Sequence, residues 1–481
     1  MAFSFGRQGT PSLIPSSMVA SNPSELLARG KIFASQDKHE DALQCFDAAT
    51  LMLQTRIRSL REESPSTPPM NGPQSSIDVE LADALVGKGI AFGRLGRTPA
   101  ATAALEDALQ CNPDNTTALS YLGLLRVRDG RHDEGIALYR RALEVDPASP
   151  LASEGLASAW VDEGTRLKNA GQAALATAKY RAAAAVCPTY ASAHYNLGIV
   201  LAEAGQVNEA IEAYRAALRH CPSYPEAHNN LGVLYKNMGR LAEAVESYRR
   251  CLQINPNIQL ASQNLALALS DLGTEVKGQG RLAEAIGLYQ QALFHNPRSA
   301  DALYNLGVAY AEACEIEKAC VCYELAAHFN PRCAEALNNL GVLHKDLDNL
   351  PRALSCYEAA LRVRPAFPEA LNNMGVVYTM MCCPDDALAY FHAALQVMPT
   401  YAEAYTNLGK FYQDAGDAEK AVEYYDKCLA LCPHSDNAAH NRLLALNYSG
   451  LRPREEVFLA HQQWGQEFSA RAAAAAAAAG G

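Results

Sequence analysis

Asparagine recurs at a regular interval along much of the chain, and its amide is the side chain here best suited to binding another polypeptide. Each carboxamide offers donors and an acceptor, so a column of them can hydrogen-bond the backbone of an extended peptide. An asparagine can equally be retained to satisfy a neighbouring turn, and the sequence leaves that alternative open. The candidate peptide-binding residues, called the ladder asparagines below, are Asn196, Asn230, Asn264, Asn305, Asn339, Asn373 and Asn407.

The sequence contains no recognisable arrangement for catalysis or metal binding. Cys314, Cys320 and Cys322 share one segment without paired histidines, so they do not match a zinc site. The adjacent Cys382 and Cys383 read as ordinary cysteines. No nucleophile elbow, P-loop or metal-hydrolase motif is present. We therefore expect no catalytic residue, no metal site and no cofactor.

The ladder asparagines stand two residues before a repeated glycine, except Asn264, which is placed one heptad earlier in a lengthened repeat. Most glycine-to-glycine steps are 34 residues, and 12, 16, 19 and 24 residues after a glycine come a small residue, an aromatic, a small residue and a proline. Small residues let two antiparallel helices approach, the aromatic fills the space where the next repeat stacks, and proline stops the second helix. The glycines are Gly30, Gly89, Gly123, Gly164, Gly198, Gly232, Gly273, Gly307, Gly341, Gly375 and Gly409.

This pattern resembles the tetratricopeptide repeat, a helical hairpin that buries its apolar surface by stacking on its neighbours. The resemblance implies an all-α fold: a right-handed superhelical solenoid of about eleven tetratricopeptide repeats with C-terminal capping helices. In such a fold the ladder asparagines line a concave groove, where partner proteins bind as extended segments. Homodimerisation through the convex surface is left open.

Departures from the 34-residue period set the expected domain organisation. The steps from Gly123 to Gly164 and from Gly232 to Gly273 are 41 residues, and the surplus is close to two helical turns, which lengthens a first helix without changing its buried face. The expected segments are a disordered N-terminus (1–22), repeat 1 (23–56), a Pro/Ser-rich loop (57–79), repeats 2 to 11 (80–433, with lengthened first helices starting near 150 and 259), capping helices (434–469) and an Ala/Gly low-complexity tail (470–481), which is either a helical extension or a spacer.

Charge and hydropathy exclude two kinds of partner. A net charge of -11 argues against nucleic acid, because phosphate binding needs clustered Lys and Arg. No stretch is long and apolar enough to cross a bilayer, so we expect no membrane partner. An acidic row follows the first helices and would repel a C-terminal carboxylate while weakly favouring basic or hydroxyl-rich peptides. Its members are Glu226, Asp301, Glu335, Glu369 and Glu403.

From about Ala82 to Phe468 the chain resembles the SPINDLY family of plant protein O-glycosyltransferases, which is related to animal O-GlcNAc transferase. The resemblance rests on the segments DEGTRLK and DLGTEVK in the lengthened repeats, on YNLGVAYAEA, and on the exit NRLLALNYSGL followed by AHQQWG. It implies a protein of the nucleus and cytoplasm, linked in plants to gibberellin signalling, whose family transfers fucose from GDP-fucose or GlcNAc from UDP-GlcNAc to Ser or Thr.

The transferase half of that family is missing where the chain runs into alanines. We therefore expect the substrate-recruiting region of a SPINDLY-like enzyme, catalytically silent as it stands, and interpret the Ala/Gly end as an interrupted reading of a longer protein. The alternative is a stand-alone adaptor or scaffold, and the transcript beyond Gly481 would separate the two.

Overall fold

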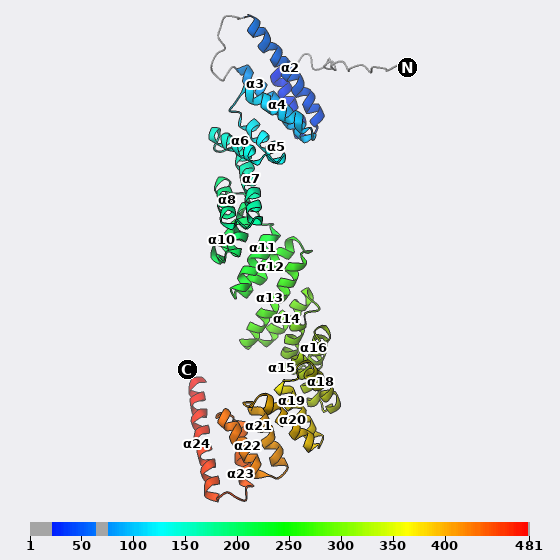
Figure 1. Ribbon diagram of the computed structural model, residues 1–481, viewed down its shortest axis with the longest axis vertical. Helices are drawn as coiled ribbons and strands as arrows, with labels where there is room; N and C mark the ends of the chain where they lie inside the picture. Colours follow the sequence, from blue (N-terminus) through cyan, green and yellow to red (C-terminus); the bar gives the residue numbers. More distant parts are fainter. Residues whose placement is uncertain (1–21, 64–75, 480–481) are drawn as a thin grey trace, which may run out of the picture. The chain divides into compact units, whose positions relative to one another are not determined.

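A computed structural model describes residues 22–63 and 76–479, and every regular element in these ranges is an α-helix (Figure 1). The chain divides into two compact units, residues 1–234 with 253–255 and residues 235–252 with 256–481. None of the helices in the described ranges combines the length and apolar character that a membrane span requires.

The first unit consists of five helical hairpins followed by the start of α11 (Pro225–Asn237), which crosses the boundary between the units. Within each hairpin a first helix packs against the second helix that follows it. The helices are α1 (Pro23–Ser35), α2 (His39–Glu63), α3 (Ser76–Arg94), α4 (Thr98–Cys111), α5 (Thr116–Arg128), α6 (His132–Val145), α7 (Pro150–Asn169), α8 (Ala173–Val186), α9 (Ala191–Glu203) and α10 (Val207–His220).

The second unit continues the same alternation and ends with two further helices. Its elements after α11 are α12 (Leu241–Ile254), α13 (Gln259–Gly278), α14 (Leu282–His295), α15 (Ala300–Glu312), α16 (Ile316–Phe329), α17 (Ala334–Asp346), α18 (Leu350–Val363), α19 (Pro368–Met380), α20 (Pro384–Val397), α21 (Ala402–Asp414), α22 (Ala418–Leu431), α23 (Asp436–Asn447) and α24 (Arg454–Ala479).

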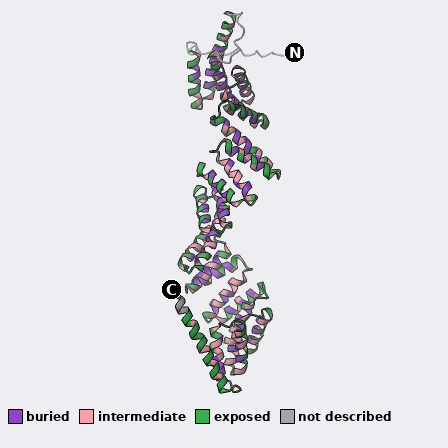
Figure 2. Cartoon of the chain, turned by 90° about the vertical axis from the view of Figure 1, so that its left-hand side faces the viewer, coloured by how far each residue is buried: buried purple, intermediate pink, exposed green. Residues whose placement is uncertain are grey.

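Most hairpins close around the contact between the repeat glycine and the aromatic ring sixteen residues later, whereas Gly89 meets Leu105 at that position. A Cβ atom added to Gly307 would lie 2.8 Å from Cε1 of Tyr323, a ring that is 2% exposed, so only glycine allows this approach. The sequence suggested that the ring fills the space before the next repeat. In the structure the ring first packs on its own hairpin, and Tyr139 reaches both Gly123 in its own hairpin and Gly155 in the next. Figure 2 shows buried residues distributed along both helices of the hairpins.

The turn inside each hairpin needs one residue with left-handed backbone geometry. Seven turns supply glycine there, with φ between 74° and 82°. Four turns use another residue with φ between 57° and 60°, a conformation that a Cβ atom disfavours. Those four residues are Asp37, Cys314, Asp348 and Cys382.

The helices α7 and α13 have 20 residues each, whereas α9, α15, α17, α19 and α21 have 13. The extra turns preserve the apolar face, because Leu265, Leu269, Gly273 and Val276 are all buried at helical spacing along α13. The seven-residue insertions are therefore accommodated inside a helix rather than in a loop.

The ends of the expected Pro/Ser-rich loop are helical, which corrects the boundaries predicted for it. Helix α2 continues to Glu63, and Ile57 packs against the core of the first hairpins, so residues with good helix propensity extend α2 before the prolines begin. Helix α3 begins at Ser76 rather than after residue 79. Residues 64–75, and 1–21 at the N-terminus, lie outside the described residues.

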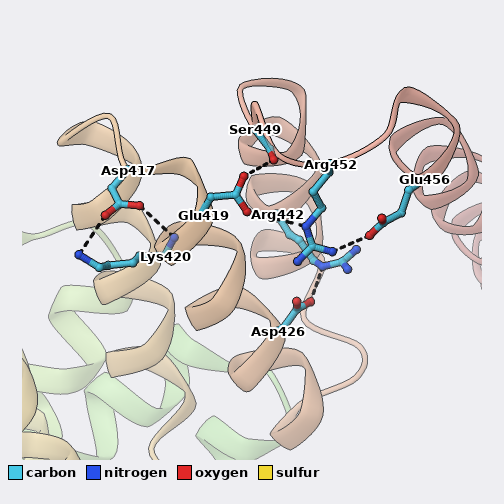
Figure 3. Close-up of polar contacts among 8 residues, drawn as sticks. All are labelled: Asp417, Glu419, Lys420, Asp426, Arg442, Ser449, Arg452 and Glu456. Atoms are coloured by element: carbon cyan, nitrogen blue, oxygen red, sulfur yellow. Dashed lines mark hydrogen bonds and ion pairs between the residues drawn. The ribbon is translucent and has the colours of Figure 1, made fainter.

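Polar contacts connect α22 with the segment that contains α23 and α24 (Figure 3). Arg442 of α23 pairs with Asp426 of α22, and Ser449 in the following loop donates a hydrogen bond to Glu419. Arg452 pairs with Glu456 in the first turn of α24. Helix α24 also packs Val457, Ala460 and Trp464 on the core around Tyr425 and Leu446, and it continues through the alanines to Ala479.

Candidate peptide-binding site

Six of the seven ladder asparagines lie in 13-residue first helices, and Asn264 lies in the longer α13. All seven side chains are half-buried, because helical periodicity places them at the margin between the packed face and solvent. This position holds the amides against neighbouring helices while leaving part of each one accessible.

In the second unit the ladder amides join successive repeats. Nδ2 of Asn407 donates to Oδ1 of Asn372 at 2.9 Å, and Nδ2 of Asn373 donates to Oδ1 of Asn338 at 3.0 Å. Nδ2 of Asn339 donates to the Tyr304 hydroxyl at 3.5 Å. Each bond spans 35 residues, so the acceptor is the residue directly before the ladder position of the preceding repeat.

Two of these bonds form one directional chain. Asn338 accepts from Asn373 and donates to Oδ1 of Asn339 at 3.4 Å, and Asn339 in turn donates to Tyr304. Asn338 is 7% exposed, so its amide works in a largely water-excluded environment where successive hydrogen bonds polarise one another. The chain fixes the orientation of the amides and couples three consecutive first helices.

In the first unit fewer ladder amides join successive repeats. Asn230 donates to the Tyr195 hydroxyl at 3.4 Å across the same 35-residue interval, and Asn229 donates to Asn230 at 3.3 Å. Asn196 instead donates to the carbonyl of Ser192 in its own helix at 2.9 Å. Asn196 therefore bonds its own helix and does not join successive repeats.

The register through α13 differs from the one expected for Asn264. Asn305 donates to the Ser270 hydroxyl at 3.5 Å, again across 35 residues, so Asp271 holds the position equivalent to a ladder asparagine in α13. Asn264 lies two helical turns earlier. Asp271 pairs with Lys236 at 3.5 Å, so the carboxylate at this position is partly neutralised.

The acidic row lies in the first turns of the first helices. Glu226, Asp301, Glu369 and Glu403 are exposed, and acids at a helix N-terminus are favoured by the helix dipole. Glu335 differs, because burial would raise the pKa of its carboxyl but hydrogen bonding and the charge of Arg364 hold that pKa below its usual value. A helix-stabilising role accounts for part of this row.

A second row of side chains, not foreseen from the sequence, accompanies the amides. Val308, Val342 and Val376 come three residues after Asn305, Asn339 and Asn373 and are half-buried against the cores of their repeats. Residues three apart on a helix share a face, so each amide is flanked by an apolar contact. The sequence signal for this second row is the valine that directly follows Gly307, Gly341 and Gly375.

One serine–histidine contact also escaped the sequence analysis. Ser262 Oγ lies 3.4 Å from Nδ1 of His295 and donates to the His295 carbonyl at 3.3 Å, tying α13 to the end of α14. Burial, together with the charge of Arg249, lowers the pKa of the His295 imidazole. Because the hydroxyl bonds the histidine's own backbone, the contact serves packing rather than the activation of a nucleophile.

An open hollow of about 440 Å³ is lined by residues of α8, α9 and α10. The lining includes Leu197, Leu201 and Ala213, together with Arg181 and Glu209, which form an ion pair at 3.1 Å. Among the described residues, no group of three or more His, Cys, Asp or Glu side chains is placed to hold a metal ion.

Comparison with protein families identifies the repeats. Family models described as tetratricopeptide or TPR repeats match residues 86–160, 200–239, 225–258, 270–319, 333–364 and 367–434. These matches, with the hairpins of both units, define an all-α tetratricopeptide-repeat solenoid, a scaffold fold of the protein-binding kind.

Two curated relatives share shorter segments. The Probable UDP-N-acetylglucosamine–peptide N-acetylglucosaminyltransferase SPINDLY of Hordeum vulgare is 45% identical over 98 residues, 20% of this chain and 10% of the relative. The protein of the same name from Eustoma exaltatum subsp. russellianum is 41% identical over 91 residues, 19% of this chain and 10% of the relative. The chain thus matches about a tenth of the length of these relatives.

The solved structures to which the chain is similar include MamA and YrrB. The crystal structure of MamA matches with a TM-score of 0.30 and 24% identity, covering 36% of this chain and 97% of that chain. The structure titled as YrrB, a TPR protein with an unusual peptide-binding site, matches with a TM-score of 0.33 and 23% identity, covering 41% of this chain and 97% of that chain.

Proposed function

We propose that the chain captures extended segments of other proteins along the ladder asparagines of its first helices. The observation that carries the proposal is the row of ladder amides on α15, α17, α19 and α21, where inter-repeat bonds occupy one amide N–H of each ladder asparagine and fix its orientation. A peptide backbone has the complementary donors and acceptors, and it can follow the amides from repeat to repeat. The valines beside Asn305, Asn339 and Asn373 supply apolar contacts for peptide side chains.

We also propose that this capture recruits substrates for a SPINDLY-like protein O-glycosyltransferase of the nucleus and cytoplasm. The local similarity to the two SPINDLY relatives supports this assignment. Fucosyl or N-acetylglucosaminyl transfer, and a connection with gibberellin signalling in plants, would then belong to the complete enzyme. This chain, incubated with UDP-GlcNAc or GDP-fucose and Ser/Thr peptides, should transfer no sugar, and robust turnover would overturn the proposal.

The capture proposal is tested with a phage-displayed library of unstructured, Ser/Thr-containing peptides. Peptides selected on the wild-type chain should bind the triple variant Asn305→Ala, Asn339→Ala, Asn373→Ala about tenfold or more weakly, equivalent to about 1.4 kcal/mol. Asn441→Ala is the matched control, because this amide lies outside the ladder and bonds Asn437 in its own helix, α23.

Circular dichroism would verify that the triple variant keeps its helices. A folded triple variant that binds the selected peptides as tightly as the wild type would refute the ladder as the binding surface.

A further inference from the structure

The turn between α19 and α20 brings four consecutive sulfur-containing residues to the surface. Met380 ends α19, Met381 and Cys382 form the turn, and Cys383 is the N-cap of α20. Met380 and Met381 are 47% and 42% exposed, Cys382 is exposed, Cys383 is half-buried, and both thiols are free. From Met380 to Cys383 no side chain offers an oxygen or nitrogen ligand.

This turn differs from the α21–α22 turn in two features. In the α21–α22 turn, Gly416 takes the left-handed position and Asp417 caps α22 by accepting from the Lys420 backbone N–H at 3.1 Å. In the α19–α20 turn, Cys382 takes that position with φ of 57°, and Cys383 makes no capping bond with its side chain. The α15–α16 turn shares both features, with Cys314 at φ of 60° and no side-chain cap at Glu315, so the run of four sulfur-containing residues is what sets the α19–α20 turn apart.

The two thiols are carried by consecutive residues of the turn. Consecutive Cα atoms are about 3.8 Å apart, and a cysteine sulfur extends only two bonds from its Cα. Sγ of Cys383 lies 3.6 Å from the Met381 carbonyl oxygen, so this sulfur folds back over the turn toward the methionine. The exposed Cys382 and Met381 side chains leave the turn open to an incoming ion.

We propose that the α19–α20 turn binds a cuprous ion, with the thiolates of Cys382 and Cys383 as principal ligands and the thioether of Met381 as the third. Soft thiolate and thioether ligands favour Cu(I), whereas a structural zinc site calls for four ligands that this turn does not supply. Each thiol that becomes a ligand releases its proton to solvent, and the copper stays Cu(I), so no electron is transferred. The site is separate from the ladder and does not depend on peptide binding.

The experiment is a Cu(I) competition titration of the full chain under anaerobic conditions. Copper is kept reduced with ascorbate and presented as its bathocuproine disulfonate complex, whose absorbance falls as the protein withdraws metal. The chain has 14 cysteines, so the informative quantity is the difference between variants. The double variant Cys382→Gly, Cys383→Ser should withdraw about one equivalent less than the wild type.

The chain contains its own control. Cys314 occupies the same left-handed position in the α15–α16 turn, but Ala313 and Glu315 flank it instead of sulfur-containing residues, so Cys314→Gly should leave the uptake unchanged. Met381→Leu should weaken binding while retaining the stoichiometry.

Hydrogen exchange supplies a second measurement. Cu(I) should slow exchange at residues 380–386 in the wild type and in Cys314→Gly, but not in the double variant. The proposal is overturned if the double variant, with its helices intact by circular dichroism, withdraws as much Cu(I) as the wild type or keeps the slowed exchange. An unchanged affinity of Met381→Leu for Cu(I) would show that the Met381 thioether is not a ligand.

Discussion

The first helices α9 and α19 carry the ladder asparagine at the same register position and use it differently. Asn373 of α19 bonds Asn338 in the preceding first helix, whereas Asn196 of α9 bonds Ser192 in its own helix. The residue 35 positions before Asn196 is Val161, which is buried and offers no acceptor. Register therefore places the amide, and the residue before the ladder position in the neighbouring repeat decides whether repeats become linked.

The largest effect should come from removing the central amide of the chain. Asn338→Ala takes away the acceptor of Asn373 and the donor to Asn339, and it leaves polar groups unsatisfied in a buried setting. We expect a loss of about 1–3 kcal/mol in the free energy of local opening of α17 and α19. Hydrogen exchange measures this opening, and it suits a repeat array that need not unfold in one step.

Asn196→Ala provides the other side of the comparison. Its amide bonds the carbonyl of Ser192, which also takes part in the backbone hydrogen bonding of α9. The loss in the free energy of local opening should therefore stay below about 0.5 kcal/mol. Equal losses in Asn196→Ala and Asn338→Ala would show that the inter-repeat amide chain adds nothing to stability.

The buried tyrosines that pack on the repeat glycines offer a second contrast at one register position. The hydroxyl of Tyr289 bonds Thr274 at 3.1 Å, whereas the equally buried hydroxyl of Tyr357 has no hydrogen-bond partner among the described residues. Tyr289→Phe should cost about 1 kcal/mol, and Tyr357→Phe should be neutral or slightly stabilising. Thermal melting of the two variants measures the difference, and a larger loss in Tyr357→Phe would contradict this account.

The repeat architecture follows from the sequence because its determinants are local and periodic. Glycine and an aromatic sixteen residues later specify one close helix contact, such as that between Gly307 and Tyr323, and every copy repeats the signal except the one at Gly89, which has Leu105. The same spacing located the ladder asparagines. It could not supply their partners, because these depend on residues 35 positions away whose type changes from repeat to repeat: Asn338, Tyr304, Ser270 or Val161.

The lengthened repeat shows where residue type misleads. Aligning Asn264 by residue type placed it in the ladder, whereas the contact of Asn305 with Ser270 selects the position of Asp271. The boundary of α2 was missed for a related reason. Composition marked a loop from residue 57, but packing of Ile57 and helix-forming residues carry the helix to Glu63.

A smaller effect is expected at the left-handed turn positions. Cys314 has φ of 60° where seven other turns have glycine, and it is exposed, so replacing it removes strain without removing a packed side chain. Cys314→Gly should raise the free energy of unfolding by about 0.5–1 kcal/mol. Urea denaturation would measure the gain, and Gly416→Ala, which imposes a Cβ at the same position in the α21–α22 turn, should show the opposite sign.

The smallest effect concerns pH and the tie between α13 and α14. Burial and the Arg249 charge lower the pKa of His295, so the folded chain holds the imidazole neutral while the unfolded chain protonates it near its ordinary value of about 6.5. Its contribution to stability is therefore complete above that value and declines as pH falls toward the lowered folded pKa. Melting temperatures from neutral pH down to about pH 5 should fall slightly less in His295→Gln than in the wild type, because glutamine does not titrate. Identical pH profiles would mean that His295 is as accessible to protons in the folded chain as in the unfolded one.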